Sequence, residues 1–270
     1  MNLNSLLKIK NFLMKIKASI ALFAVLILTY FFLSNGNVFI PLPKIFSLSF
    51  SMSSLENIFS FIFVHENLYH LLANALTVLG YAVLVELSLG ALDVIAIFIF
   101  STIISALLFA FVNPSVGLIG SSIGMSGLAA VSLIIDPKRA VVLTMGLFLI
   151  LFFITPLIFS SIDSEGQNIK DEKLVVEQQI QEAINQGDVE QQKVLVEKRF
   201  EIQQKQEEFD LSKEFSKKTP INNEIHAFGA FFGMLYLILF RRKKFNKSVR
   251  NIFHPNFIDF DKHGLFSEKK

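Results

Sequence analysis

The sequence predicts an all-α polytopic membrane protein, a bundle of six transmembrane helices with a helical hairpin inserted outside the membrane between helices 5 and 6. Three observations support this fold class. Of the 270 residues, 52% are hydrophobic, and the mean hydropathy is +0.53. The apolar residues are gathered into long runs, as membrane-crossing helices require. One long charged stretch, 161–222, separates the last two runs.

Six apolar runs mark the predicted spans. They are 18–34, 68–88, 91–112, 126–136, 140–160 and 224–240. Because a helix needs about 20 residues to cross the hydrocarbon, the fourth run is too short to cross alone. The first run is long for a signal peptide, and no small-residue cleavage pattern follows it, so we expect an uncleaved helix.

The basic residues set the expected orientation. Lysines crowd the tail 1–17, Lys138 and Arg139 follow the fourth run, and four basic residues begin the tail 241–270. Because Lys and Arg favour the cytosolic side, all three clusters are placed there. Both termini are then cytosolic, and the loop 35–66 and the insertion 161–222 are external.

The insertion differs in composition from the rest of the chain. It is rich in Glu, Gln and Lys, and its apolar residues recur at roughly helical spacing, with an interruption at Gly187-Asp188. We expect two amphipathic helices that pair outside the membrane. A solvated spacer is equally consistent with the pattern, and no metal or nucleotide motif lies within it.

Polar residues at membrane depth are functional candidates because burying them there is costly. His70 and Asn74 are four residues apart in the second run, so they project from one helix face. Two donors on one face suit a developing negative charge. A polar contact between helices is the alternative interpretation.

A Gly- and Ser-rich segment, 117–127, precedes the short fourth run. That run spans only about 15 Å at 1.5 Å per residue, so Ser126 should lie below the outer surface. A serine at a helix start also has free backbone N–H groups beside it, which suits a nucleophile that needs an anion site. A simple connecting loop is the alternative.

The last run begins with a histidine and two spaced glycines. Gly229 and Gly233 form a face that lets another backbone approach closely, and His226 lies on that face. Histidine is a suitable base near neutral pH. A serine, a base and a donor pair together predict an acyl-transfer site with a Ser–His dyad. A histidine facing water is the alternative for His226 alone.

Other protease chemistries do not fit the residues. The chain has no cysteine, which excludes thiolate nucleophiles, disulfides and Cys-based metal sites. His65 and His70 would point about 140° apart on a helix, so they are poorly placed to share a zinc ion. Asp93 and Asp136 lie at span ends and do not suit an aspartyl dyad. We therefore expect no metal, no cofactor and no nucleic-acid partner.

Over about 55–135 and 223–240, the chain resembles the rhomboid family of intramembrane serine proteases. The matching residues are His65, His70, Asn74, Glu86, Gly124, Ser126, Gly127, His226, Gly229 and Gly233. Their order and spacing agree with the family pattern, including its G-x-S-G motif. Among them, His65, Glu86 and the four glycines are expected to support the site structurally.

The resemblance implies roles for these residues. Ser126 would be the nucleophile and His226 the general base, and the oxyanion hole would combine the Ser126 backbone N–H with the side chains of His70 and Asn74. The family cleaves membrane proteins with a single transmembrane helix, which enter from the lipid bilayer between spans two and five. Those substrates and the bilayer are the expected partners.

The chain also departs from the family pattern. Glu56 and Asn57 stand where many members have Trp-Arg, and Ala130 replaces an aromatic residue that stacks on the catalytic histidine. Two alternatives remain open. One is an inactive rhomboid-like protein that binds or chaperones membrane clients, and the other is a small transporter.

Overall fold

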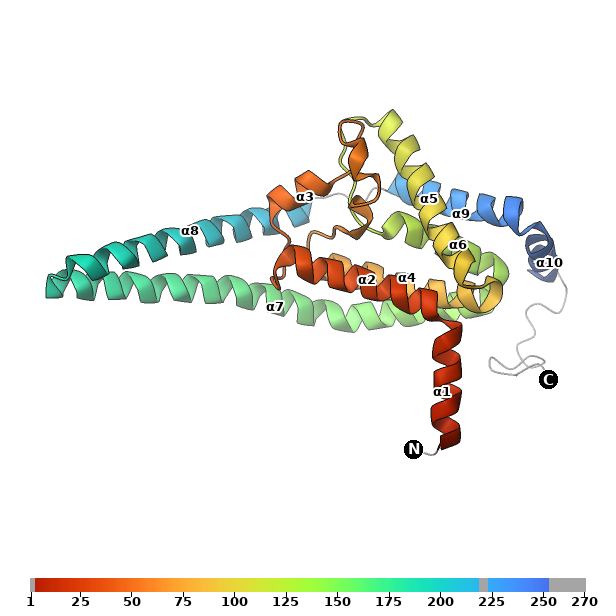
Figure 1. The fold of residues 1–270 in the computed structure, drawn as a ribbon, viewed down its shortest axis with the longest axis horizontal. Helices are drawn as coiled ribbons and strands as arrows, with labels where there is room; N and C mark the ends of the chain where they lie inside the picture. Colours follow the sequence, from red (N-terminus) through yellow and green to blue (C-terminus); the bar gives the residue numbers. More distant parts are fainter. Residues whose placement is uncertain (1–2, 219–222, 253–270) are drawn as a thin grey trace.

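The computed structural model describes residues 3–218 and 223–252, which form helices joined by loops (Figure 1). Residues 219–222 of the predicted insertion and 253–270 of the predicted tail lie outside the described residues. The α-helices are α1 (Leu3–Lys15), α2 (Lys17–Ser34), α3 (Leu42–Leu48), α4 (Leu68–Leu89), α5 (Ala91–Val112), α6 (Ser122–Ile135), α7 (Pro137–Gln186), α8 (Val189–Lys218), α9 (Asn223–Phe240) and α10 (Arg242–Ile252). Two short 3-10 helices, Leu55–Ile58 and Phe61–Phe63, lie in the loop before α4.

The helices form a bundle around α6. Five of them, α2, α4, α5, α7 and α9, are long and apolar enough to cross a membrane, and α6 is a shorter apolar helix of 14 residues. Helix α6 packs against α4, α5 and α9. This all-helical architecture with several apolar helices agrees with the predicted fold class. The count of six crossings stays a prediction.

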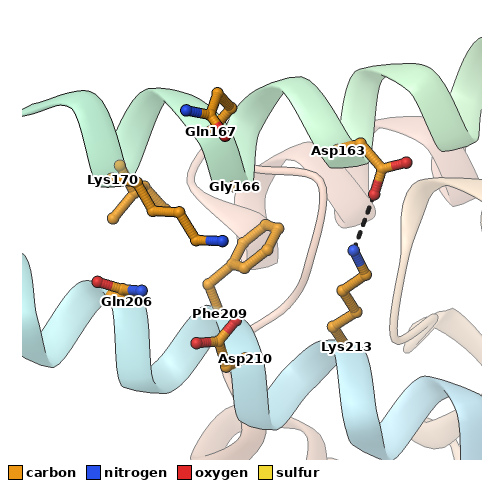
Figure 2. Close-up of a pocket in the computed structure, with 9 residues that line it drawn as sticks. Asp163, Gly166, Gln167, Lys170, Gln206, Phe209, Asp210 and Lys213 are labelled. Carbon is orange, nitrogen blue, oxygen red and sulfur yellow. Dashed lines mark hydrogen bonds and ion pairs between the residues drawn. The ribbon is translucent and has the colours of Figure 1, made fainter.

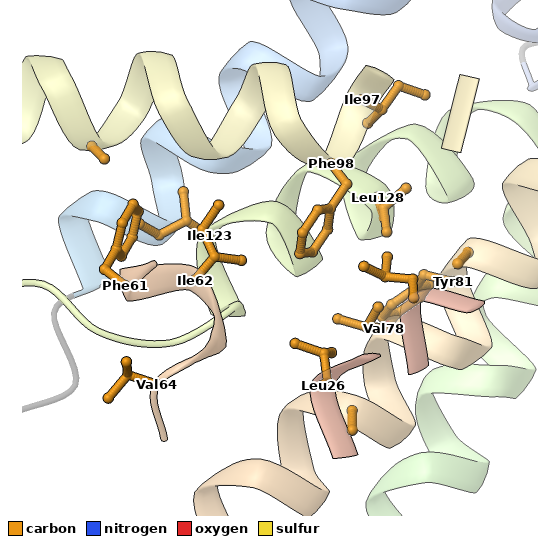
Figure 3. Close-up of a cluster of buried hydrophobic side chains, with 14 of the residues drawn as sticks. Leu26, Phe61, Ile62, Val64, Val78, Tyr81, Ile97, Phe98, Ile123 and Leu128 are labelled. Carbon is orange, nitrogen blue, oxygen red and sulfur yellow. The ribbon is translucent and has the colours of Figure 1, made fainter. Parts of the chain in front are cut away.

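The core of the bundle is apolar and tightly filled. Figure 3 shows Leu26 of α2, Phe98 of α5 and Leu128 of α6 directed into one cluster. Leu26 and Leu128 are fully buried, and Phe98 is nearly so. This packing holds α6 in a fixed position between its neighbours, which matters because α6 carries Ser126.

The start of α6 differs from the prediction. The sequence predicts a helix start at Ser126, but α6 begins at Ser122, so Ser126 lies one turn inside the helix. Tertiary contacts explain the earlier start. His65 Nε2 accepts from the Ser121 backbone N–H and also contacts its hydroxyl, at 3.4 and 3.1 Å. Gly124 lies against Phe98, where an added Cβ would come within 2.5 Å of the ring.

Two buried carboxylates join helix ends at one end of the bundle. Glu86 of α4 accepts from the first-turn N–H groups of Ala18 and Ser19, at 3.0 and 2.8 Å, and so caps α2. Asp93 of α5 accepts two hydrogen bonds from the Arg241 guanidinium, at 2.8 and 2.9 Å, in a bidentate ion pair. The same carboxylate holds the pKa of Arg241 above its usual value through hydrogen bonding and charge.

Helix α7 continues far beyond the apolar run that begins it. Its 50 residues run without a break through the expected boundary at 160–161, and α8 returns along it (Figure 1). The turn between them has Gly187 in the left-handed region, at φ 70°, which glycine adopts readily. This turn coincides with the interruption noted in the sequence.

The two helices of this hairpin pack in seven-residue steps. Their buried apolar residues are Ile162, Ile169, Val176 and Ala183 on α7, and Leu195, Ile202 and Phe209 on α8. Figure 2 shows Phe209 next to Gly166, and the ion pair of Lys213 with Asp163 at 2.8 Å. A seven-residue repeat is typical of coiled coils, so the hairpin is an antiparallel coiled coil.

Candidate active site

Helices α6 and α9 approach each other at backbone distance. A Cβ added to Gly233 would lie 2.5 Å from the Gly127 carbonyl oxygen, and one added to Gly229 would clash with the Ile123 carbonyl. Both contacts therefore require glycine. Because Gly229 and Gly233 oppose Ile123 and Gly127 in the same order, the helices run parallel. His226, one turn before Gly229, then lies beside the first turn of α6.

The hydrogen-bond partner of His226 is Ser122. His226 Nε2 lies 2.9 Å from Ser122 Oγ, and Ser126 Oγ donates to the Ser122 carbonyl at 2.9 Å. Ser122 thus contacts both members of the predicted dyad. The hydrogen bonds of the described residues do not include one between Ser126 and His226. Sequence reasoning assigned no role to Ser122, although it lies one turn from Ser126 on the same helix face.

Asn74 presents a buried donor to the same region. Its Nδ2 has no hydrogen-bond partner within the part of the chain that the structure describes. A Cβ added to Gly120 would lie 3.2 Å from His70 Nε2 and 3.6 Å from Asn74 Nδ2, so both side chains border the loop that enters α6. Gly120 has φ +95°, which favours glycine. The predicted pair therefore meets at the start of the serine-bearing helix.

His70 is held by two residues that the sequence analysis did not assign. Its Nδ1 is hydrogen-bonded to Glu66, and its backbone N–H donates to Asn67 Oδ1 at 2.7 Å. Asn67 is the N-cap of α4. Both could have been found from the sequence, because an acid–histidine pair at i, i+4 and an Asn before a helix are recognisable patterns. The Glu66 contact leaves His70 Nε2 directed toward Gly120.

His65 lies behind the site and is fully buried. Since the Ser121 N–H donates to Nε2, the ring proton belongs on Nδ1, which faces the Phe63 carbonyl at 3.3 Å. Burial, and secondarily the nearby His70, lower the pKa of His65 well below its ordinary value. A neutral His65 is therefore a fixed link between the loop before α4 and the start of α6.

The free backbone donors at the start of α6 are not those expected. The first helical bond runs from the Met125 N–H to the Ser121 carbonyl at 3.0 Å. The unbonded first-turn N–H groups consequently belong to Ser122, Ile123 and Gly124. The Ser126 N–H lies within the helical pattern, so it can join an oxyanion hole only if the first turn of α6 opens.

Among the described residues, no cluster of three His, Asp or Glu side chains is arranged to hold a metal ion. The site thus consists of hydroxyl, imidazole and amide groups, which suit proton transfer and anion binding.

Comparison with known proteins gives one match. The family model of the Rhomboid domain matches residues 52–169. This range includes the loop before α4, helices α4 to α6 and part of α7, and ends before α9. No curated protein and no solved structure matches significantly.

Proposed function

Because the chain is a rhomboid family protein, we propose that it is an intramembrane serine endopeptidase that cleaves transmembrane or membrane-proximal segments of membrane proteins. Ser126 is the nucleophile and His226 the base in this proposal. Its several apolar helices make it an integral membrane protein. The proposal places both termini in the cytosol and opens the site to the outer side.

The observation that carries the proposal is the buried Asn74 Nδ2, which has no hydrogen-bond partner among the residues that the structure describes. A buried donor without a partner costs roughly 1–3 kcal/mol, so it is rarely left unpaired without a use. Here it lies with His70 beside the loop that leads into Ser126. An oxyanion formed at Ser126 would supply the missing acceptor. A helix that only packed against its neighbours would gain nothing from this arrangement.

The proposed chemistry requires His226 to exchange partners. Its Nε2 would leave Ser122 Oγ and accept the proton of Ser126 Oγ, which attacks the scissile carbonyl. The carbonyl oxygen becomes negative and accepts hydrogen bonds from Asn74 Nδ2–H and His70 Nε2–H. Donation by Nε2 requires a second proton, which Nδ1 shares with Glu66. His226 then gives the proton to the leaving amine. Water, activated in the same way, hydrolyses the acyl-enzyme and restores Ser126.

Substrate entry between spans two and five corresponds to α4 and α7. These helices are joined by the hydroxyls of Tyr81 and Thr144 at 2.7 Å, and by the rings of Tyr69 and Phe159 at 5.7 Å. A substrate helix would have to separate these contacts.

A second candidate is the inactive client-binding protein. It is favoured by one observation, namely that Ser122 is hydrogen-bonded to both Ser126 and His226, which are not bonded to each other in the described structure. A fluorophosphonate probe separates the two functions, because it reacts only with an activated serine. The experiment labels the full chain in membrane vesicles and locates the adduct by peptide mass spectrometry.

Five variants complete this test. We expect Ser126→Ala and His226→Ala each to abolish labelling and cleavage of a transmembrane substrate, with no further loss in the double variant. Ser122→Ala should still be labelled at Ser126, and Ser132→Ala is a matched serine control on α6. An adduct on Ser122 would show that Ser122, one turn before Ser126, is the nucleophile. A chain that is folded but unlabelled would favour client binding.

A further inference from the structure

Helix α1 lies apart from the bundle. Figure 1 shows it turning away from α2 and running crosswise to it, after a break at Ile16. Residues 6–15 are all exposed, and Leu13 and Met14 are 46% and 56% exposed. Since α2 is a candidate membrane span that begins at Lys17, a helix that runs crosswise to it at that end is oriented to lie along a membrane surface.

The exposed helix is amphipathic. Leu6, Ile9 and Leu13 recur at helical spacing on one side, whereas Lys8, Asn11 and Lys15 share the other. A shallow groove runs along the apolar side and is lined by Leu6, Ile9, Lys10, Leu13, Met14 and Lys17. Apolar walls with two lysines suit an acyl chain and the phosphate above it, because lysine stems lie along apolar surface while the charge reaches outward.

The exposed charge at this end of the bundle is positive. No acidic residue precedes Glu56 in the chain. The acids nearby are engaged: Glu86 caps α2, Asp93 pairs with Arg241, and Asp136 pairs with Arg139. Helix α10 adds further exposed basic residues, namely Arg242, Lys243, Lys247 and Arg250.

We propose that α1 is an interfacial helix that lies in the headgroup layer of an anionic leaflet. Its apolar side enters the acyl-chain boundary, and its lysines, with those of α10, bind lipid phosphates. Amphipathic helices rich in Lys bind membranes through both apolar burial and attraction to anionic lipids. This role is separate from the proposed proteolysis, since α1 is remote from Ser126 in the fold.

The test uses single-cysteine labels, which are clean because the chain has no cysteine. Leu13→Cys on the apolar side and Asn11→Cys on the opposite side carry an environment-sensitive fluorophore. The full chain is reconstituted in phosphatidylcholine vesicles with or without phosphatidylglycerol. In the anionic vesicles we expect the Leu13 label to be quenched by nitroxides on lipid acyl chains and shielded from aqueous iodide. The Asn11 label should show the reverse.

Charge is tested by replacing Lys8, Lys10 and Lys15 with Gln. Each lysine near an anionic surface strengthens binding roughly fivefold, so three lysines together contribute on the order of 100-fold. In anionic vesicles, the ratio of membrane-buried to water-exposed Leu13 label should fall by about this factor. It should not change in pure phosphatidylcholine. The control removes three exposed lysines of the hairpin, Lys170, Lys193 and Lys205. The proposal is overturned if the two labels behave alike, or if the two lysine variants have equal effects.

Discussion

At the scale of single residues, Asn74 is the group whose environment is hardest to explain without a ligand. Its neighbour His70 has both Glu66 and Asn67 as partners, whereas the Asn74 amide nitrogen has none among the described residues. Most buried polar groups are paired, so an exception calls for an explanation, of which a catalytic role is one. Substitution of Asn74 therefore distinguishes a catalytic role of this residue from a role in packing.

Asn74→Ala is expected to lower activity without lowering stability. Losing one oxyanion donor should lower kcat by roughly 10²–10³, or about 2.7–4 kcal/mol, with little change in KM. Removing a donor that has no partner should not lower thermal stability. The measurements are steady-state cleavage in vesicles and thermal unfolding in detergent.

A matched control is available on α5. Ser105 also has a buried side-chain oxygen without a partner in the described structure, and lies on a different helix. Ser105→Ala should leave kcat unchanged. If Asn74→Ala behaved like Ser105→Ala, Asn74 would be a packing residue and the oxyanion assignment would fail.

Much of the candidate site could be proposed from the sequence residue by residue. His70, Asn74, Ser126 and His226 stand out because polar groups in apolar runs are rare. Ser122 was not predictable, because its contact with His226 depends on how α6 and α9 align. That alignment is set by backbone contacts that no local pattern encodes.

At the scale of elements, the parallel pair α6 and α9 determines where His226, the proposed base, lies. Gly127, Gly229 and Gly233 allow the two backbones to touch, and they fix the height of His226 relative to α6. The sequence predicted this close face from the glycine spacing. It did not predict the start of α6, since Ser and Gly are typical of loops and only the contacts of Ser121 and Gly124 make this segment helical.

Gly229→Ala should displace the base. Its Cβ would clash with the Ile123 carbonyl, which belongs to a buried helix backbone and has no room to move. Forcing atoms into a packed core costs about 1–3 kcal/mol, so the thermal unfolding midpoint should fall. Cleavage should fall further than this destabilisation explains, because His226 is attached one turn away.

Gly146→Ala is the matched comparison on α7. A Cβ there meets nothing within 4 Å, and alanine favours a helix over glycine by up to about 1 kcal/mol. It should be neutral or stabilising and should cleave normally. Normal cleavage by Gly229→Ala at a temperature where it is folded would show that the α6–α9 register does not control the dyad.

At the scale of the whole molecule, the coiled-coil hairpin is joined to the loops around the site. Phe209 and Phe215 of α8 stack edge-to-face on Phe39 and Phe46, with ring centres 5.4 and 5.6 Å apart. Asn67, the cap of α4, donates to Ser216 at 2.6 Å. The sequence predicted two charged amphipathic helices here, but not this anchoring, because the contacts join residues far apart in the chain.

These contacts allow the outer hairpin to be tested without disturbing its base. Seven-residue spacing means that residues 170–183 and 195–208 can be deleted together, since Ile169 then still faces Phe209. Both helices become about 21 Å shorter at 1.5 Å per residue. The anchors Phe209, Phe215 and Ser216 remain, so the core should fold and be labelled by a serine-reactive probe as before.

We expect the shortened hairpin to exclude fewer substrates on the basis of the size of their external portions. Substrates that differ only in their external portions are compared in reconstituted vesicles. A substrate with a bulky external domain should be cleaved with a higher kcat/KM, because the shorter hairpin leaves more room for that domain. A substrate with a short external segment should be cleaved at the original rate. Ser216→Ala is a separate control, which disturbs the Asn67 cap without shortening the hairpin and should lower both rates together. If the deletion leaves the ratio of the two substrates unchanged, the outer hairpin is a passive spacer.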